Sequence, residues 1–154
     1  MIRFTKVNLP FGWLGNMAPF PIVYNGKKWL TSEALFQALR FNDEKIIEEI
    51  RLEKSPMGAK MKAKKYKTFY VIAPMSEKDV ENMKMCVRLK VSQHPILKSQ
   101  LLATNNLEIC EDIGSRNGER HKFWGAKLEN NVWVGNNMMG KIWMELRDEL
   151  KNCQ

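Results

Sequence analysis

The chain has 154 residues, of which 44% are apolar, and its net charge at pH 7 is +8. This length predicts one domain with a hydrophobic core, and the composition is not that of a disordered chain. No segment reaches the roughly 20 apolar residues of a membrane span, and no signal peptide is recognisable. Three cysteines and two histidines form neither a metal motif nor a disulfide framework. We therefore expect a cytoplasmic protein with no metal, cofactor or membrane partner.

The first half of the chain favours short strands followed by capped helices. The expected elements are a strand at residues 2–5, an irregular loop at 11–20, a hairpin at 21–29, and helices from 32, at about 43–51 and from 56. Asn25-Gly26 is typical of the hairpin turn. Thr31 is suited to cap the first helix. Ser55, followed by Pro56, is suited to cap the third.

The second half predicts two longer helices with a loop-rich segment between them. The expected elements are an extended segment or strand at 68–74, a long helix from 77, a short helix at 94–104, two short strands within 106–135, and a last helix capped by Asn137. Ser76 and Asp79 have the spacing of a capping-box-like pair. The pattern predicts a single α+β domain over residues 1–154, mainly helical with small antiparallel β pieces.

The segment "WLTSEALFQALRF", residues 29–41, predicts a helix that is apolar almost all round. Glu33, Gln37 and Arg40 nevertheless fall within one narrow sector of its helical wheel. Buried charges need partners, so one interpretation is an internal ion pair of Glu33 with Arg40 or with a loop amide. The other is a pocket in which the carboxylate polarises water or a hydroxyl, the amide orients it, and the guanidinium holds an anion.

Four further segments are candidates for binding or chemistry. They are the loop around Trp13 and Asn16, the acidic strand with Glu111, the Trp124-Gly125 pair with the helix start at Asn137, and the basic run "KMKAKKYK" that holds Lys60 and Lys64. A flat indole suits a base, a helix N-terminus suits a phosphate, and clustered lysines attract anions. An ordinary turn, a solvated acidic turn, a core tryptophan and a solvated basic face are the structural alternatives.

Taken in order, these segments resemble the NADAR family, also called YbiA-like. The similar segments are "FGWLGNMAPFPI", "WLTSEALFQALRF", "SPMGAKMKAKK", the stretch from Lys90 to Glu111, "FWG" and "GNNMMGKIWMELR". The resemblance covers nearly the whole chain, and the ordered set is specific although no single motif is. Two positions depart from the family pattern. Arg40 stands where the family usually has lysine, and His121 replaces an acidic residue three positions before the Trp-Gly pair.

The resemblance implies hydrolysis of an N-glycosidic bond between a base and a phosphorylated ribose or ADP-ribose. The substrates it implies are riboflavin-pathway intermediates or ADP-ribosylated guanine, the latter possible on a nucleic acid. The implied catalytic residues are Glu33, Gln37, Arg40 and Glu111. The implied substrate-binding residues are Trp13, Asn16, Lys60, Lys64, Lys90, Trp124, Gly125 and Asn137.

Two other functions are compatible with the same residues. Arginine cannot form an imine with an opened ribose, so Arg40 also favours a module that binds ADP-ribose without hydrolysing it. The basic run favours a nucleic-acid-binding module, although its single aromatic residue, Tyr66, makes no stacking array. The sequence does not predict the oligomeric state.

Overall fold

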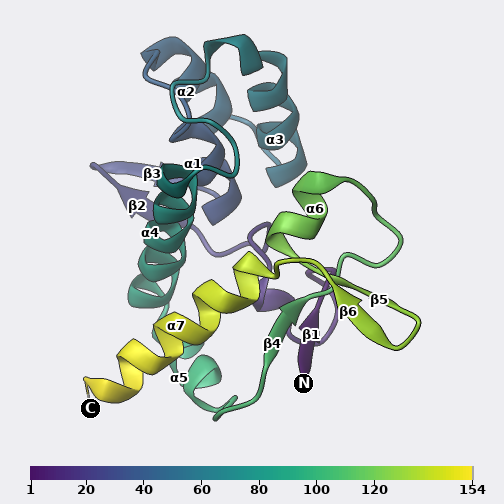
Figure 1. Cartoon of the computed structure of the whole chain (residues 1–154). Coiled ribbons are helices and arrows are strands. Elements are labelled where there is room, and N and C mark those ends of the chain that lie inside the picture. Colours follow the sequence, from purple (N-terminus) through teal and green to yellow (C-terminus); the bar gives the residue numbers. More distant parts are fainter. Residues whose placement is uncertain (154) are drawn as a thin grey trace. The chain divides into compact units, whose positions relative to one another are not determined.

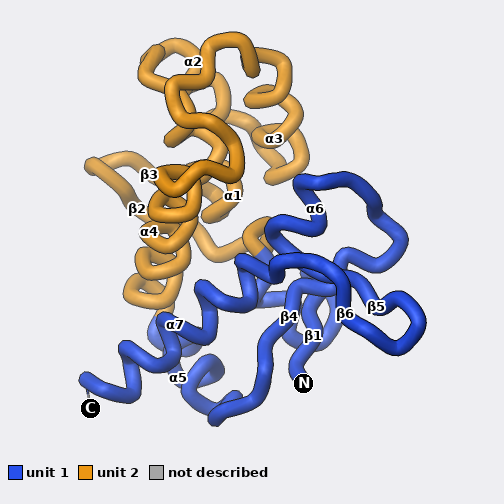
Figure 2. Tube along the Cα trace, in the orientation of Figure 1, with its two compact units in different colours: residues 1–15, 95–154 blue, residues 16–94 orange. Residues whose placement is uncertain are grey.

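The computed structural model describes residues 1–153 and divides into two compact units (Figures 1 and 2). Unit 2 comprises residues 16–94, and unit 1 comprises residues 1–15 together with the described residues from 95 onward. Across residues 1–153, no helix has the length and apolar character that crossing a membrane requires.

Unit 2 consists of one hairpin and four α-helices. Its elements are β2 (Ile22–Tyr24), β3 (Lys27–Trp29), α1 (Ser32–Ala38), α2 (Glu44–Arg51), α3 (Pro56–Lys65), the 3-10 turn η2 (Lys67–Phe69) and α4 (Glu77–Gln93). The hairpin is antiparallel, as expected. Its turn has positive φ at Asn25 (50°) and Gly26 (76°), which is the conformation that this residue pair favours.

The predicted helix starts in unit 2 are confirmed by their side-chain caps. Thr31 accepts a hydrogen bond from the N–H of Ala34, and Ser55 accepts one from the N–H of Gly58. Helix α1 is buried at every position from Ser32 to Ala38, as its apolar pattern predicts. It packs against α2, α3 and α4. The carboxylate of Glu33 and the amide of Gln37 therefore lie inside the unit rather than on its surface.

Unit 1 is built around a short parallel strand pair and a long C-terminal helix. Its elements are β1 (Ile2–Phe4), the 3-10 turn η1 (Gly12–Leu14), α5 (Pro95–Leu102), β4 (Ile109–Glu111), α6 (Glu119–Trp124), β5 (Lys127–Glu129), β6 (Val132–Val134) and α7 (Met138–Asn152). β1 pairs with β4, with Phe4 opposite Glu111. Trp143 of α7 is fully buried, and its indole N–H donates to the Leu14 carbonyl at 3.0 Å.

The structure confirms the α+β class and corrects several local predictions. The β1–β4 pair is parallel, whereas all the β pieces were expected to be antiparallel. The segment 106–135 holds the helix α6 and three strands instead of two strands and loop. Of the two alternatives for residues 68–74, the strand is absent: the segment begins in the 3-10 turn η2 and continues without regular structure. Asp79 does not complete a capping box: its N–H donates to Ser76, but its carboxylate accepts from the N–H of Met75.

Candidate functional site

The carboxylate of Glu33 is held by two carboxamides within unit 2. Glu33 is only 8% exposed. Asn16 Nδ2 donates to Glu33 Oε2 at 2.7 Å, and Gln37 Nε2 donates to Glu33 Oε1 at 2.9 Å. Asn16 is fixed in turn, because its backbone carbonyl accepts the Glu33 N–H at 3.0 Å and its side-chain oxygen accepts from the Ser32 hydroxyl. Each carboxylate oxygen thus receives one N–H, an arrangement suited to an ionised carboxylate, which only accepts.

Arg40 lies just beyond the end of α1 and forms a buried ion pair with Asp79 of α4. Its Nε donates to Asp79 Oδ1 at 2.9 Å and its Nη2 to Asp79 Oδ2 at 2.8 Å. Its Nη1 donates to Gln37 Oε1 at 3.3 Å, and the guanidinium lies over the rings of Phe36 and Tyr70. Burial alone lowers the pKa of Arg40, but the hydrogen bonds and charge of Asp79 outweigh it, so the pKa lies above its usual value.

The sequence analysis considered a contact of Glu33 with Arg40 or with a loop amide. The loop amide is present, because Asn16 donates to Glu33, whereas Arg40 pairs with Asp79 and not with Glu33. The side chains of Glu33 and Arg40 instead lie at opposite ends of Gln37, which bridges them. The sequence contained one signal for Asp79: a buried arginine requires an acid, and Asp79 lies in the first turn of a helix. Its spacing from Ser76 is also that of a helix cap, so the sequence did not identify Asp79 as the partner of Arg40.

The buried polar residues of α1 continue onto one face of α4. We call the whole set the polar seam and define it as Asn16, Ser32, Glu33, Gln37, Arg40, Asp79, Cys86 and Lys90. Asp79, Cys86 and Lys90 recur at helical spacing and are all buried. Burial raises the pKa of the Cys86 thiol, and the negative charges of Glu33 and Asp79 raise it further. Burial lowers the pKa of Lys90 to about 7. The Lys90 ammonium lies 5.4 Å from the ring centre of Phe20.

The basic run lies on α3 and the turn after it. Lys62 pairs with Glu53 at 3.4 Å. Lys64 and Lys65 are exposed, and Lys60 is half-buried. The run therefore contains both a partnered lysine and lysines that face solvent, which allows their contributions to be separated by mutation.

In unit 1, Asn137 joins the strand β4 to the start of α7. Its Oδ1 accepts the N–H of Glu111 at 3.0 Å and its Nδ2 donates to the Ile109 carbonyl at 2.9 Å. Asn137 is the residue directly before α7, as predicted. The predicted cap hydrogen bond is absent, because the Asn137 side chain bonds to β4 instead. The half-buried Glu111 is thereby fixed through its backbone.

The Trp124-Gly125 pair lies against the same strand. A Cβ on Gly125 would meet the Glu111 carbonyl oxygen at 2.6 Å, so only glycine fits this approach. Gly125 also accepts the N–H of Asn137 at 3.0 Å. Unit 1 therefore brings Glu111, Trp124, Gly125 and Asn137 together. Trp13, half-buried, packs edge-on against Trp143 at 5.8 Å between ring centres.

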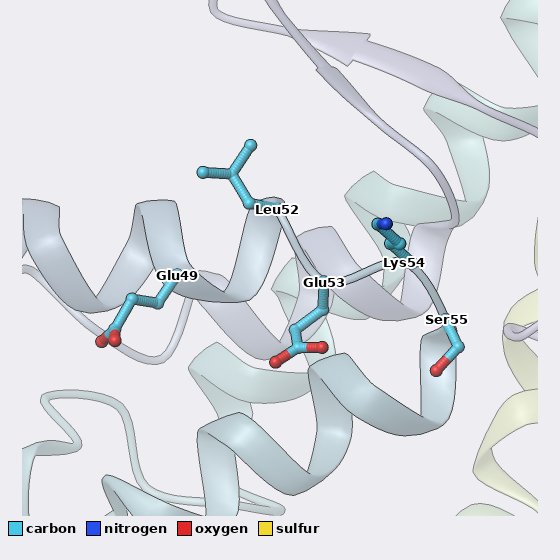
Figure 3. Close-up of a pocket in the computed structure, with 5 residues that line it drawn as sticks. All are labelled: Glu49, Leu52, Glu53, Lys54 and Ser55. Atoms are coloured by element: carbon cyan, nitrogen blue, oxygen red, sulfur yellow. The ribbon is translucent and has the colours of Figure 1, made fainter.

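The candidate residues thus form two sets, one in each unit. Unit 2 gathers Asn16, Glu33, Gln37, Arg40 and Lys90 in the polar seam. A separate hollow in unit 2, lined by Glu49, Leu52, Glu53, Lys54 and Ser55, contains none of the candidates. Leu52 there points away from the two glutamates (Figure 3). Within residues 1–153, no group of three or more His, Cys, Asp or Glu side chains is arranged to hold a metal ion.

Comparison with known proteins places these residues in a family context. The family model of the NADAR domain matches residues 3–151. A protein of Escherichia coli (strain K12) named N-glycosidase YbiA is 35% identical over 151 residues, 97% of this chain and 88% of that protein. The NMR structure of the E. coli protein YbiA is similar with a TM-score of 0.76 and 33% identity, covering 98% of this chain and 84% of that one. A Vibrio vulnificus (strain YJ016) protein named riboflavin biosynthesis protein VVA0006 is 30% identical over 155 residues, 97% of this chain and 38% of that protein.

Proposed function

This chain belongs to the NADAR family, and from that premise we propose that it is an N-glycosidase. We propose as its substrate a base joined to a phosphorylated ribose or to ADP-ribose, such as a riboflavin-pathway intermediate or ADP-ribosylated guanine. The names of the E. coli and Vibrio relatives support this reaction class. Because the family model runs through both units, we also propose that they form one functional domain.

The observation that carries the proposal is the buried, doubly hydrogen-bonded carboxylate of Glu33. Cleavage of an N-glycosidic bond passes through an oxocarbenium-like state with positive charge on the ribose. A fixed carboxylate in a buried site stabilises that charge without having to reorganise. Asn16 and Gln37 hold the carboxylate in place, and Arg40 contributes the electrostatic field of its ion pair with Asp79.

The remaining roles are assigned by residue type. Glu111 is the second acid–base candidate, to protonate the leaving base or to activate water. Trp13, Trp124 and Gly125 contribute to a wall for the base, and Asn137 at the N-terminus of α7 lies where a helix dipole attracts phosphate. Lys60 and Lys64 supply positive charge for the phosphate groups of the substrate. Lys90, whose pKa burial lowers to about 7, adds a charge there only in its protonated form. The reaction needs no metal or redox cofactor.

The free thiols support a proposal for the cellular setting. Cys86, Cys110 and Cys153 are all free, and burial raises the pKa of Cys110 to about 11, which keeps that thiol protonated and unreactive. Free thiols suit a reducing compartment, so we propose that the protein acts in the cytoplasm.

One observation favours a second function. Arg40 occupies the position of the lysine in the family pattern and is engaged by Asp79. If the family chemistry needs that amine, the protein binds ADP-ribose or a related nucleotide without hydrolysing it.

Incubation with a panel of ribosylated substrates separates the two functions. The panel contains ribosylamino-pyrimidine phosphates and ADP-ribosylated guanosine, and released base is measured by chromatography. The N-glycosidase proposal expects release that depends on Glu33 and falls in Glu33→Gln. Melting shifts with ADP-ribose but no released base from any substrate would instead identify a binding module.

A further inference from the structure

Arg40 fixes which end of the Gln37 carboxamide faces the catalytic carboxylate. A glutamine side chain has one donor end and one acceptor end, whereas a guanidinium only donates. Arg40 Nη1 donates to Gln37 Oε1 at 3.3 Å, so the acceptor end of Gln37 points toward Arg40. The donor end then points toward Glu33 and reaches its Oε1 at 2.9 Å. The carboxylate of Glu33, which only accepts, favours the same orientation, and Arg40 adds its constraint from the other end of the amide.

Asp79 fixes Arg40 in turn. It binds the guanidinium at two nitrogens, 2.9 and 2.8 Å away, and its side chain is fully buried. Asp79 is itself held by the N–H of Met75 at 2.8 Å. A two-pronged contact between two planar groups prevents rotation of the guanidinium. The rings of Phe36 and Tyr70 beneath it, with centres 4.7 and 5.6 Å away, add a third constraint.

We infer that Asp79 is a positioning residue for N-glycoside hydrolysis, acting through Arg40 and Gln37 to keep an N–H directed at Glu33. The side chain of Asp79 hydrogen-bonds to Arg40 and to the N–H of Met75, so in this proposal its effect on Glu33 passes through Arg40 and Gln37. The inference rests on the proposed function for its kinetic consequence, but the orientation of Gln37 is a property of the protein alone. The alternative is that Asp79 and Arg40 only join α1 to α4, in which case Gln37 keeps its orientation without them.

The first experiment compares wild type with Asp79→Asn. Asparagine keeps the size of the side chain but removes its charge and one acceptor oxygen, so the guanidinium is no longer held at both nitrogens. We expect kcat to fall by about tenfold to a hundredfold, the scale of a misplaced catalytic group, while KM changes by less than about threefold. Asp43→Asn is the matched control, because Asp43 is an exposed N-cap of α2 whose role asparagine can also fill. An unchanged kcat in folded Asp79→Asn would overturn the inference.

A double-mutant cycle then tests whether Asp79 acts through Gln37. Gln37→Leu removes the amide while keeping most of its volume. If Asp79 acts through this amide, adding Asp79→Asn to Gln37→Leu causes no further fall in kcat. If Asp79 only braces the helices, the two reductions multiply, and the inference is rejected.

The third measurement does not require turnover, so it remains decisive if no substrate is hydrolysed and the proposed function fails. The side-chain NH2 signals of Gln37 are followed by 1H–15N NMR and assigned by their loss in Gln37→Leu. We expect solvent exchange of these protons to be about tenfold faster in Asp79→Asn than in wild type. Identical exchange in the two proteins would refute the positioning role. Asp79→Asn leaves a buried arginine without its charge partner, which is destabilising, so Arg40→Met with Asp79→Leu serves as a second variant. It removes both charges, and the same faster exchange is expected.

Discussion

Replacement of Glu33 by glutamine removes the negative charge of the carboxylate and preserves its shape. The new carboxamide accepts only one of the two N–H groups that Glu33 accepts. Gln37 cannot turn round, because its NH2 would then face the guanidinium of Arg40, which also donates. Asn16 can turn, because the Ser32 hydroxyl that donates to it accepts equally well. We therefore expect the Asn16 amide to flip and every donor near position 33 to stay satisfied.

The effect on stability follows from these contacts. Two hydrogen bonds to a charged group, each worth about 1.5–3 kcal/mol, become neutral ones worth about 0.5–1.5 kcal/mol. A neutral amide costs less to bury than a carboxylate, which offsets much of that loss. We expect the free energy of unfolding to change by less than about 1 kcal/mol, or roughly 2–4 °C in Tm. By contrast, kcat should fall about a hundredfold or more, equivalent to about 2.7 kcal/mol of transition-state stabilisation.

The assay measures kcat and Tm for wild type, Glu33→Gln and the control Glu44→Gln, which alters an exposed acid in the first turn of α2. The control should match wild type in kcat. If Glu33→Gln keeps both its kcat and its Tm, the carboxylate is not part of the mechanism. If kcat falls only together with a loss of more than about 10 °C in Tm, the charge is structural.

Three further predictions concern other charged residues. The pKa of Lys90 is about 7 in the fold against 10.5 ordinarily, so between these pH values the unfolded chain holds a proton that the folded chain lacks. The free energy of unfolding of wild type should therefore rise by about 1 kcal/mol per pH unit relative to Lys90→Met in urea titrations. Parallel pH dependence would contradict this. Arg147 is buried and donates two hydrogen bonds from its Nη1. The substitution Arg147→Met should therefore lower the free energy of unfolding by about 3 kcal/mol. A loss below about 1 kcal/mol in the same urea titration would contradict this. Lys64→Gln with Lys65→Gln should weaken substrate capture and flatten its salt dependence, measured as kcat/KM against ionic strength, whereas the partnered Lys62→Gln should not. If wild type and Lys64→Gln with Lys65→Gln have equal salt slopes, the basic run is only a solvated face.

The structure shows why the polar line of α1 was predictable. A seven-residue helix with Thr31 as its cap and apolar residues on nearly every side had to be buried. Glu33 and Gln37, four residues apart, then had to lie on one face and meet. Both conclusions depend only on local spacing, which the sequence displays directly.

The partners of these groups were not predictable in the same way. Asp79 lies 39 residues from Arg40, and its position after Ser76 is equally typical of a helix cap. The strands β1 and β4 are parallel and far apart in sequence, and three-residue strands carry no pattern that selects a partner. Helix α6 begins after Gly118, which provides no side-chain cap, so the usual start signal is missing.

The change of Arg40 to lysine tests the departure from the family pattern. Arg40 contacts Asp79 with two nitrogens and Gln37 with a third. A lysine has one nitrogen on a flexible chain, so it binds Asp79 and leaves the Gln37 oxygen without a donor. We therefore expect kcat to fall by about tenfold in Arg40→Lys. If lysine at this position were the nucleophile of an imine mechanism, the same change would raise kcat.

Borohydride trapping in the presence of substrate decides between these mechanisms. An ammonium paired with buried Asp79 stays protonated, and a protonated amine does not attack the anomeric carbon of an opened ribose. Lys90 differs, because burial lowers its pKa to about 7, so it is about half unprotonated at neutral pH. We expect no adduct at position 40 in wild type or in Arg40→Lys, and any adduct should map by peptide mass to Lys90 and disappear in Lys90→Met. An adduct at position 40 in Arg40→Lys, accompanied by faster turnover, would show that the ion pair with Asp79 does not hold the amine protonated. Position 40 would then be where the family nucleophile belongs. Unchanged kcat and ligand affinity would show that position 40 contributes to the fold alone.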